Sequence, residues 1–523
     1  MSSKTVFEKP ISSLRNVVLD LKDLLTPKNY RFIDCAQFVK SRTLVISEIS
    51  TFPTFPYSAV SYVWRGNPLS GTVTDSTSSF SVEGAKDGDP VSVDVLTHVC
   101  TASLQSGANY VWLDRLCISQ TDPEDKAWQI TQMYRVYQAC HRCFILPGGI
   151  SRLVGLNEET SWIHRAWTLQ EVLAPNYAMV LFAWHAGPGW FYGKSRGDLV
   201  EVIEHQSAVV EIDDLLRPYL GGDTFFTTDD DEPDQRIKID PIIFGRESSH
   251  VIALLGAMDA RDGPDTDDHA PHAIWRSAMM RTSSRPVDMV FSIMGLFNVI
   301  LDPRSFDKND RIGATIALAR EILRQGGKPS WLGVSFSIPP SRAISTFPEF
   351  PMTRVEGKAL IRTDNGTKEI AEVIQDEFLA AWSLREAIEK GSMDEDGYLT
   401  FSSKAARIVP GRCPSASTSD TGRIVVKDED SNDWEILSDE GAANLQSNDP
   451  RRFIVYVGMA LAHPWASRPM YLEIYSLRAI LVEEHKPEKF HRTSNFTLGP
   501  CYEAVVKTWK EHDFNVGPVV NTD

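Results

Sequence analysis

The sequence has few basic residues, few cysteines and no long apolar run. Its 523 residues contain 53 lysines and arginines against 70 aspartates and glutamates, which gives a formal net charge of −17 at pH 7. Nucleic-acid-binding proteins normally present a basic face, so this charge argues against general nucleic-acid binding, although a few local arginines could hold a small anionic ligand. No stretch approaches the roughly 18 apolar residues of a membrane span. We therefore expect neither a nucleic-acid partner nor a membrane span.

The motifs of the commonest nucleotide, zinc-protease and esterase sites are also absent. The chain has no G-x-x-x-x-G-K-[ST], no G-x-G-x-x-G, no H-E-x-x-H and no G-x-S-x-G. Its seven cysteines are irregularly spaced, and the single C-x-x-C of Cys140 and Cys143 has no second pair to complete a zinc site. The stretch 265–272 combines acids with histidines, which could trap a metal ion but is more simply a solvated acidic loop. We expect buried thiols, no cofactor and no metal.

The first ten residues, MSSKTVFEKP, contain no apolar run after a basic residue. A secretory signal needs such a run, so none is expected. Together with the missing membrane span, this predicts a soluble, cytoplasmic protein with reduced thiols.

What the chain does contain is an ordinary globular composition, with 42% hydrophobic and 24% charged residues. Near-continuous apolar strands alternate with helical patterns in its first part, which is typical of an α/β domain with a mostly parallel sheet. After two consecutive prolines near residue 340 the pattern changes to short strands and polar turns. The expected segments are an N-terminal docking helix (1–40), the α/β domain (41–192), a mainly helical region (193–340) with acidic loops at 228–233 and 262–269, and a β-rich C-terminal domain (341–523).

One helix, predicted over residues 161–173, stands out in the α/β domain. Ser161 is a suitable N-cap, and Pro175 would end the helix. Glu171 and Trp167 lie one turn apart, away from the apolar stripe, so we expect them to form the wall of a cleft. The stripe that packs on the core consists of Trp162, Ala166, Leu169 and Leu173.

Four motifs in this part occur in a fixed order: YSAVSYVW (57–64), VWLDRLCISQTD (111–122), QITQMYRVY (129–137) and RAWTLQE (165–171). They resemble the ordered blocks of the fungal heterokaryon-incompatibility (HET) domain. A later run, RTSSRPVDMVFSIMGL (281–296), is similar to a segment that often follows this domain. The resemblance implies non-self recognition and regulated cell death in fungi, through a protein partner or self-association. HET domains have also been considered remote relatives of Toll/interleukin-1 receptor domains, which implies a flavodoxin-like fold.

Some members of that larger family hydrolyse NAD with a helical glutamate, and the segment from Ser161 to Glu171 is similar to theirs. The alternative function is therefore NAD cleavage by Glu171, whose carboxylate could stabilise an oxocarbenium-like state. Trp167 could stack on the substrate, and Asp114 would lie at the carboxyl edge of the sheet, where α/β proteins bind ligands. The further ligand-binding candidates are Arg65 and Arg115, which could pair with a pyrophosphate, and Trp64.

Each candidate also has a structural interpretation. Glu171 could instead form an ion pair with Arg165 or Arg115, Trp167 could pack against a neighbouring domain, and Asp114 could cap the following loop. Cys117 lies between apolar residues, which favours a core position over a nucleophile. His164 has no serine or aspartate at useful spacing, so no catalytic triad is expected.

Overall fold

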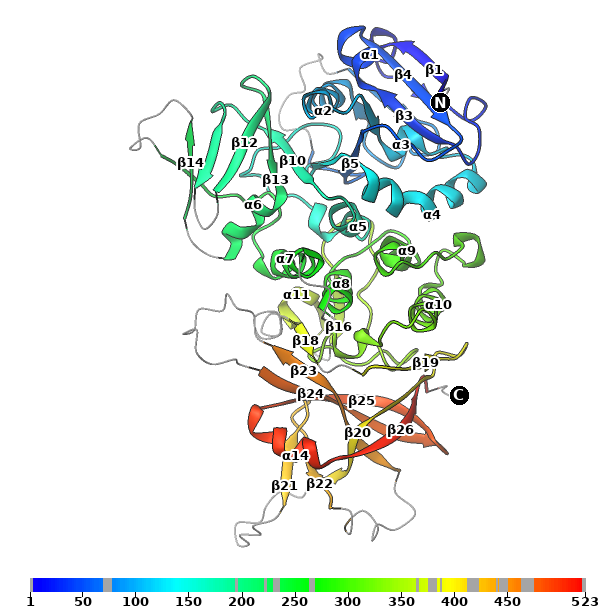
Figure 1. Cartoon of the computed structure of the whole chain (residues 1–523), viewed down its shortest axis with the longest axis vertical. Coiled ribbons are helices and arrows are strands. Elements are labelled where there is room, and N and C mark those ends of the chain that lie inside the picture. The colour runs from blue at the N-terminus through cyan, green and yellow to red at the C-terminus, as the bar shows by residue number, and fades with distance from the viewer. Residues whose placement is uncertain are drawn as a thin grey trace. The chain divides into compact units, whose positions relative to one another are not determined.

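The computed structural model describes most of the chain and divides it into two compact units (Figure 1). Unit 1 comprises Met1–Leu255, Phe291–Asp307 and Val355–Lys358, and unit 2 comprises the remainder. The expected acidic loops and the candidate metal stretch fall largely outside the described residues. These residues are 3–68, 78–192, 196–220, 223–228, 236–262, 269–363, 366–374, 383–385, 388–411, 423–438, 441, 450–461 and 475–519.

Unit 1 is built on a twelve-stranded mixed sheet. Its centre consists of four parallel strands in the spatial order β8 (Tyr110–Trp112), β5 (Tyr57–Tyr62), β9 (Arg142–Leu146) and β10 (Ala178–Ala183). Counted along the chain, this order is second, first, third, fourth. Antiparallel strands extend the sheet on both sides, so the fold is α/β but the sheet is mixed rather than mostly parallel. These strands are β1 (Lys4–Pro10), β4 (Thr43–Ile49) and β3 (Tyr30–Asp34) beside β8, and β13 (Ser207–Glu211), β12 (Arg196–Ile203), β11 (Gly189–Tyr192), β14 (Thr224–Thr228) and β15 (Ile237–Ile239) beside β10.

The central strands are buried on both faces, which explains why they are largely apolar, with Ser58 and Ser61 of β5 as buried exceptions. Tyr57 and Ala59 of β5 pack into one core together with helix α4 (Pro123–Ala139), whereas Val60 and Tyr62 pack into another with helix α2 (Val93–Gln105). Successive side chains of a strand point to opposite faces, so the two cores lie on the two sides of the sheet. Helix α4 begins at Pro123, because Asp122 caps it and a proline suits its first position.

Two helical predictions are wrong. Residues 14–25 form turns and the short strand β2 (Val18–Leu19), and Asn16 has a φ of 56°, a left-handed conformation that no α-helix contains. The segment from Leu199 to His205, also expected to be helical, lies largely in β12. Buried Gly197 and Leu199 alternate there with exposed residues, as in a half-buried strand, and a register shift between Glu201 and Ile203 accompanies the burial of Val202.

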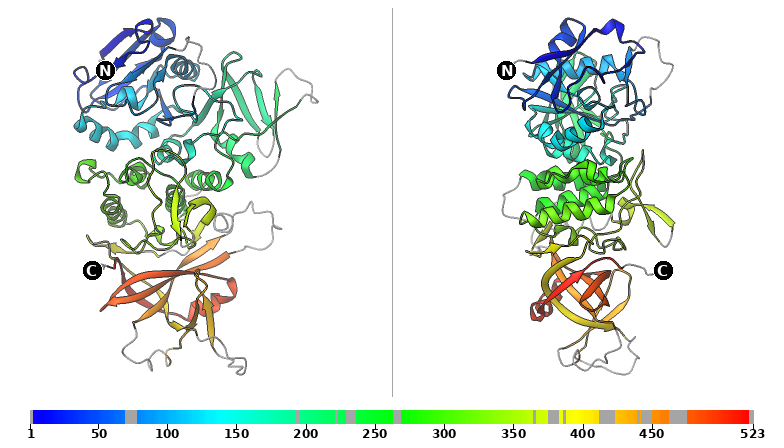
Figure 2. Two further views of the ribbon diagram at one scale, coloured as in Figure 1. Left: turned by 180° about the vertical axis from the view of Figure 1, so that it is seen from behind. Right: turned by 90° about the vertical axis from the view of Figure 1, so that its right-hand side faces the viewer.

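Unit 2 combines helices with the β-rich C-terminal region that was expected. Five strands form a closed ring. Each strand pairs with the next of the five along the chain, and the last pairs with the first. Figure 2 shows these strands curled into a barrel. The ring consists of β20 (Leu399–Pro410), β23 (Arg452–Leu461), β24 (Tyr475–Lys486), β25 (Lys489–Leu498) and β26 (Lys510–Val516), and helices of this unit include α8 (His269–Met279) and α10 (Arg311–Arg324).

Among the helices described, none combines the length and the apolarity that crossing a membrane requires.

Candidate functional site

The structure brings three of the candidate residues together where β5 and β8 end. Asp114 follows β8 and accepts two hydrogen bonds from side chains at the end of β5. The Tyr62 hydroxyl donates to its Oδ1 at 2.5 Å, and the Trp64 Nε1 donates to its Oδ2 at 3.1 Å. Burial, followed by the negative charge of Asp114, raises the pKa of Tyr62 well above its usual value. Both carboxylate oxygens of Asp114 therefore serve to fix the strand ends.

Arg115, the third member of this group, is buried and holds backbone rather than facing an open site. Its guanidinium lies 4.9 Å from the centre of the Trp64 ring and donates to the carbonyl oxygens of Trp64, at 3.0 Å, and Asp89. A Cβ atom on Gly88 would lie only 1.8 Å from the guanidinium, so this loop closes tightly over it. The arrangement ties the segment around Asp89 to the loop that follows β5.

Glu171 belongs to a separate buried network at the end of β5. Its side chain is only 8% exposed, and its Oε2 accepts a hydrogen bond of 2.6 Å from the Ser61 hydroxyl. Ser61 in turn accepts a bond of 2.9 Å from the Trp162 Nε1. After burial, the charge of Glu171 is the largest cause that raises the pKa of Tyr137. The carboxylate is thus held inside the domain, with a serine as its neighbour.

The helix predicted around Glu171 is shorter than expected. Residues Trp162–His164 form a 3-10 turn, and the α-helix α5 spans only Thr168–Leu173. Ser161 makes no capping hydrogen bond through its side chain. Trp167 is half-buried and packs against the core on the α4 side of the sheet. The four residues of the expected core stripe are all buried, so the apolar side of the segment was correctly predicted.

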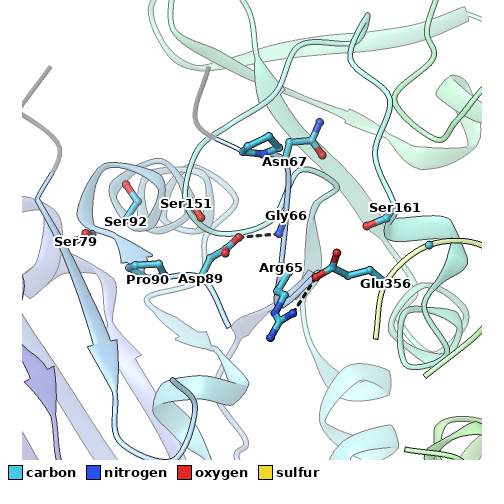
Figure 3. Close-up of a pocket in the computed structure, with 12 residues that line it drawn as sticks. Arg65, Gly66, Asn67, Ser79, Asp89, Pro90, Ser92, Ser151, Ser161 and Glu356 are labelled. Atoms are coloured by element: carbon cyan, nitrogen blue, oxygen red, sulfur yellow. Dashed lines mark hydrogen bonds and ion pairs between the residues drawn. The ribbon is translucent and has the colours of Figure 1, made fainter. Parts of the chain in front are cut away.

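A cavity of about 600 Å³ opens at the carboxyl edge of the parallel strands (Figure 3). It lies beside the loops that follow the neighbouring strands β5 and β9. The chain continues from β5 to β8 on one side and from β9 to β10 on the other, and open α/β sheets bind ligands at such a point in the strand order. Of the candidate residues, Arg65 alone lines it. The lining consists of Arg65, Gly66, Asn67, Pro68, Ser79, Asp89, Pro90, Ser92, Ser151, Ser161, Glu356 and Gly357.

Glycines allow the two loops beneath the cavity to cross in close contact. A Cβ on Gly66 would lie 1.9 Å from the carbonyl oxygen of Gly148, and Gly149 has a φ of +91°, which L side chains rarely adopt. The Gly66 amide donates to the Asp89 Oδ2 at 2.7 Å. Sequence reasoning missed Asp89 and the glycine pair, although the Pro-Gly-Gly after β9 was a visible signal of a special backbone conformation.

A buried ion pair was also missed. Asp125 and Arg31 are fully buried, and the Arg31 Nη1 lies 2.8 Å from the Asp125 Oδ2. The same carboxylate accepts hydrogen bonds from the backbone amides of Lys28 and Ser119, at 2.8 and 3.0 Å. The sequence showed Asp125 only as an acid in the first turn of a helix, because its partner is 94 residues away.

The expectation of buried thiols is confirmed for five cysteines and is wrong for Cys501, which is exposed, whereas Cys413 lies outside the described residues. Burial raises the pKa of Cys117 and of Cys140 to about 12, so both are protonated near neutral pH. Within the described residues, no group of three or more histidine, cysteine, aspartate or glutamate side chains is arranged to hold a metal ion. The buried cysteines are Cys35, Cys100, Cys117, Cys140 and Cys143.

Comparison with known protein families finds a match in the central part of unit 1. The sequence profile of the heterokaryon incompatibility protein (HET) family matches residues 57–157, from the first residue of β5 into the loop after β9. No curated protein and no solved structure gives a significant match to the chain. The matched range contains Arg65 and the network of Asp114 and Arg115, and it confirms the resemblance inferred from the sequence motifs. Residues 57–157 therefore match the family model of the heterokaryon incompatibility (HET) domain.

Proposed function

We propose that this protein is a cytoplasmic effector of fungal heterokaryon incompatibility, which triggers regulated cell death through a protein partner or through self-association. The observation that carries the proposal is the HET match over residues 57–157. In support, Asp114 and Arg115 of that range hold the chain after β5 in place, which suits a scaffold that presents a surface.

The HET core is proposed to be flavodoxin-like. The order of its parallel strands, β8-β5-β9-β10, is the order 2-1-3-4 with which a flavodoxin-like sheet begins. The remote relationship to Toll/interleukin-1 receptor domains rests on this order and on the sequence resemblance.

NAD cleavage by Glu171 has less support in the geometry. The carboxylate is 8% exposed, receives a hydrogen bond from Ser61 and is not among the residues that line the cavity. The roles of Glu171 as catalyst and of Trp64, Asp114, Arg115 and Trp167 as ligand contacts stay predictions. Incubating the full-length protein with NAD, for wild type and Glu171→Gln, tests the catalytic role. If the protein does not cleave NAD, wild type and Glu171→Gln will release nicotinamide at the same background rate.

The effector role is tested by inducing the full chain in a fungal host and counting viable cells, with and without a fused domain that forces dimerisation. We expect viability to fall for wild type, and Asp114→Asn to restore it, because the amide that replaces one carboxylate oxygen cannot accept the bonds from Tyr62 and Trp64 together. The matched control is Asp302→Asn, an exposed aspartate paired with Arg304. If induced and dimerised wild type leaves viability unchanged, the proposal is wrong.

A further inference from the structure

We propose that the cavity at the carboxyl edge is a binding site for the phosphate ester of a sugar, and that residues Val355–Lys358 form a displaceable strap whose Glu356 carboxylate occupies the phosphate position. The HET assignment names no ligand. The inference does not depend on the proposed role in cell death.

The strap consists of four residues that lie on unit 1, while the chain before and after them belongs to unit 2. Three side chains of unit 1 hold it. The Arg65 Nη1 lies 3.0 Å from the Glu356 Oε1, the Arg165 Nη1 donates to the Val355 carbonyl oxygen at 2.6 Å, and a Glu247 oxygen lies 2.5 Å from the Lys358 Nζ. Glu356 and Gly357 of the strap line the cavity directly (Figure 3).

The contact between Arg65 and Glu356 is suited to exchange. The two side chains are 47% and 60% exposed, and exposed ion pairs contribute little to stability. The Arg65 Nε donates to the Asp87 carbonyl oxygen at 2.8 Å, which fixes the guanidinium at the mouth of the cavity. A phosphate matches the planar guanidinium as well as a carboxylate does and carries more negative charge. It therefore competes effectively for the place that Glu356 holds.

The other residues that line the cavity indicate which organic group is attached to the phosphate. Apart from two prolines and two glycines, the lining residues carry hydroxyl, amide or charged groups, with no aliphatic or aromatic side chain on which an apolar ring could pack. Because the lining has no aromatic or long aliphatic side chain, it offers a nucleobase no ring to stack on and a lipid tail no hydrophobic channel. A ligand rich in hydroxyl groups suits this lining. It could form hydrogen bonds with the hydroxyls of Ser79, Ser151 and Ser161 and with the carboxylate of Asp89, which already accepts a hydrogen bond from the Gly66 amide. A volume of about 600 Å³ accommodates a sugar phosphate.

Calorimetric titration of the full-length protein with ribose 5-phosphate, ribose and inorganic phosphate tests the site. We expect ribose 5-phosphate to bind more tightly than either part alone. Glu356→Gln should tighten binding about three- to fivefold, because the competing carboxylate loses its charge, and Arg65→Gln should weaken it at least tenfold. Arg65→Lys, which keeps the charge without the planar fork, should lie between. Arg304→Gln removes an exposed, paired arginine elsewhere in unit 1 and is the matched control.

The opposite responses of Glu356→Gln and Arg65→Gln cannot arise from unfolding, which weakens binding in both. Equal affinities in these two variants would overturn the proposal, as would absence of ribose 5-phosphate binding to Glu356→Gln. Vesicles containing phosphatidylinositol 4-phosphate distinguish a lipid headgroup from a soluble sugar phosphate. If the protein binds these vesicles but not ribose 5-phosphate, the proposal is also overturned. A failure in either arm leaves the viability experiment unaffected, so the two proposals fail separately.

Discussion

Substitutions of single residues in unit 1 should lower the free energy of unfolding by very different amounts. We expect one of the largest effects at Asp125. Its carboxylate accepts four hydrogen bonds, two from Arg31 and two from backbone amides, and has no access to water. We expect Asp125→Ala to lower the free energy of unfolding by about 3–5 kcal/mol, because the buried Arg31 loses its close partner and keeps only Glu48, whose Oε2 lies 4.0 Å from the Arg31 Nε. Urea unfolding followed by tryptophan fluorescence measures the change. The exposed Asp302→Ala is the control and should change little, so equal effects of the two substitutions would contradict the prediction.

Asp214 predicts a pH dependence. Burial, followed by the neighbouring charges of Glu211 and Asp213, raises the pKa of Asp214 from the usual 3.8 to about 6. Between about pH 4 and 6 the folded state therefore binds a proton that the unfolded state lacks, so this group makes the protein less stable as the pH rises through that window. Asp214→Asn should be more stable than wild type at pH 7 and equally stable below pH 4. Unfolding curves at pH 4, 5, 6 and 7 test this, and a difference that is constant across the series would refute it.

At the scale of elements, the strands were more predictable than the helices. The apolar runs at β5, β8, β9 and β10 are buried on both faces, so their sequences indicate strands whatever their neighbours are. The helix expected over residues 161–173 divides into a 3-10 turn and the short α5, although its apolar residues are buried as expected. Periodicity reports which residues face a core, but it does not report where the backbone hydrogen bonds change from one helical form to another.

The crossing of the two loops beneath the cavity depends on glycine. Gly66→Ala should destabilise unit 1 by about 1–3 kcal/mol and distort the cavity, because its Cβ would overlap the Gly148 carbonyl. Gly256→Ala is the matched control: this glycine lies in helix α7 (Ser248–Asp262), and an added Cβ meets no atom within 4 Å. Alanine there should stabilise the helix by about 0.5–1 kcal/mol. Thermal unfolding of both variants gives shifts of opposite sign if the loops are as close as the structure places them.

At the scale of the whole molecule, the two compact units each have a core and their own buried polar network. In unit 2 this network centres on Arg492, which is 4% exposed and donates to Asn495 at 2.6 Å and to the carbonyl oxygens of Leu332 and Thr346 at 3.3 Å. Sequence reasoning expected a β-rich C-terminal region, but it had no means of finding this arginine, because the carbonyls it binds are some 150 residues away along the chain. The boundaries of the four expected segments stay predictions.

The two units should unfold in separate steps. We expect calorimetry to resolve two transitions, with Asp125→Ala lowering one and Arg492→Ala lowering the other by at least ~2 kcal/mol, since each substitution removes a buried charged group confined to one unit. If both variants shift a single common transition, the units are not independent in stability.

The sequence by itself determined the α/β class, the central strands, five buried thiols and the resemblance of residues 57–157 to the HET family, because all of these depend on local patterns of side chains or on motifs within one segment. Only the tertiary structure decided which polar residues meet. It enclosed Glu171 beside Ser61, joined Asp114 to the end of β5, and left Arg65 at the cavity opposite a glutamate 291 residues away. Such pairings are created by chain folding over long separations, and neither periodicity nor residue type records them.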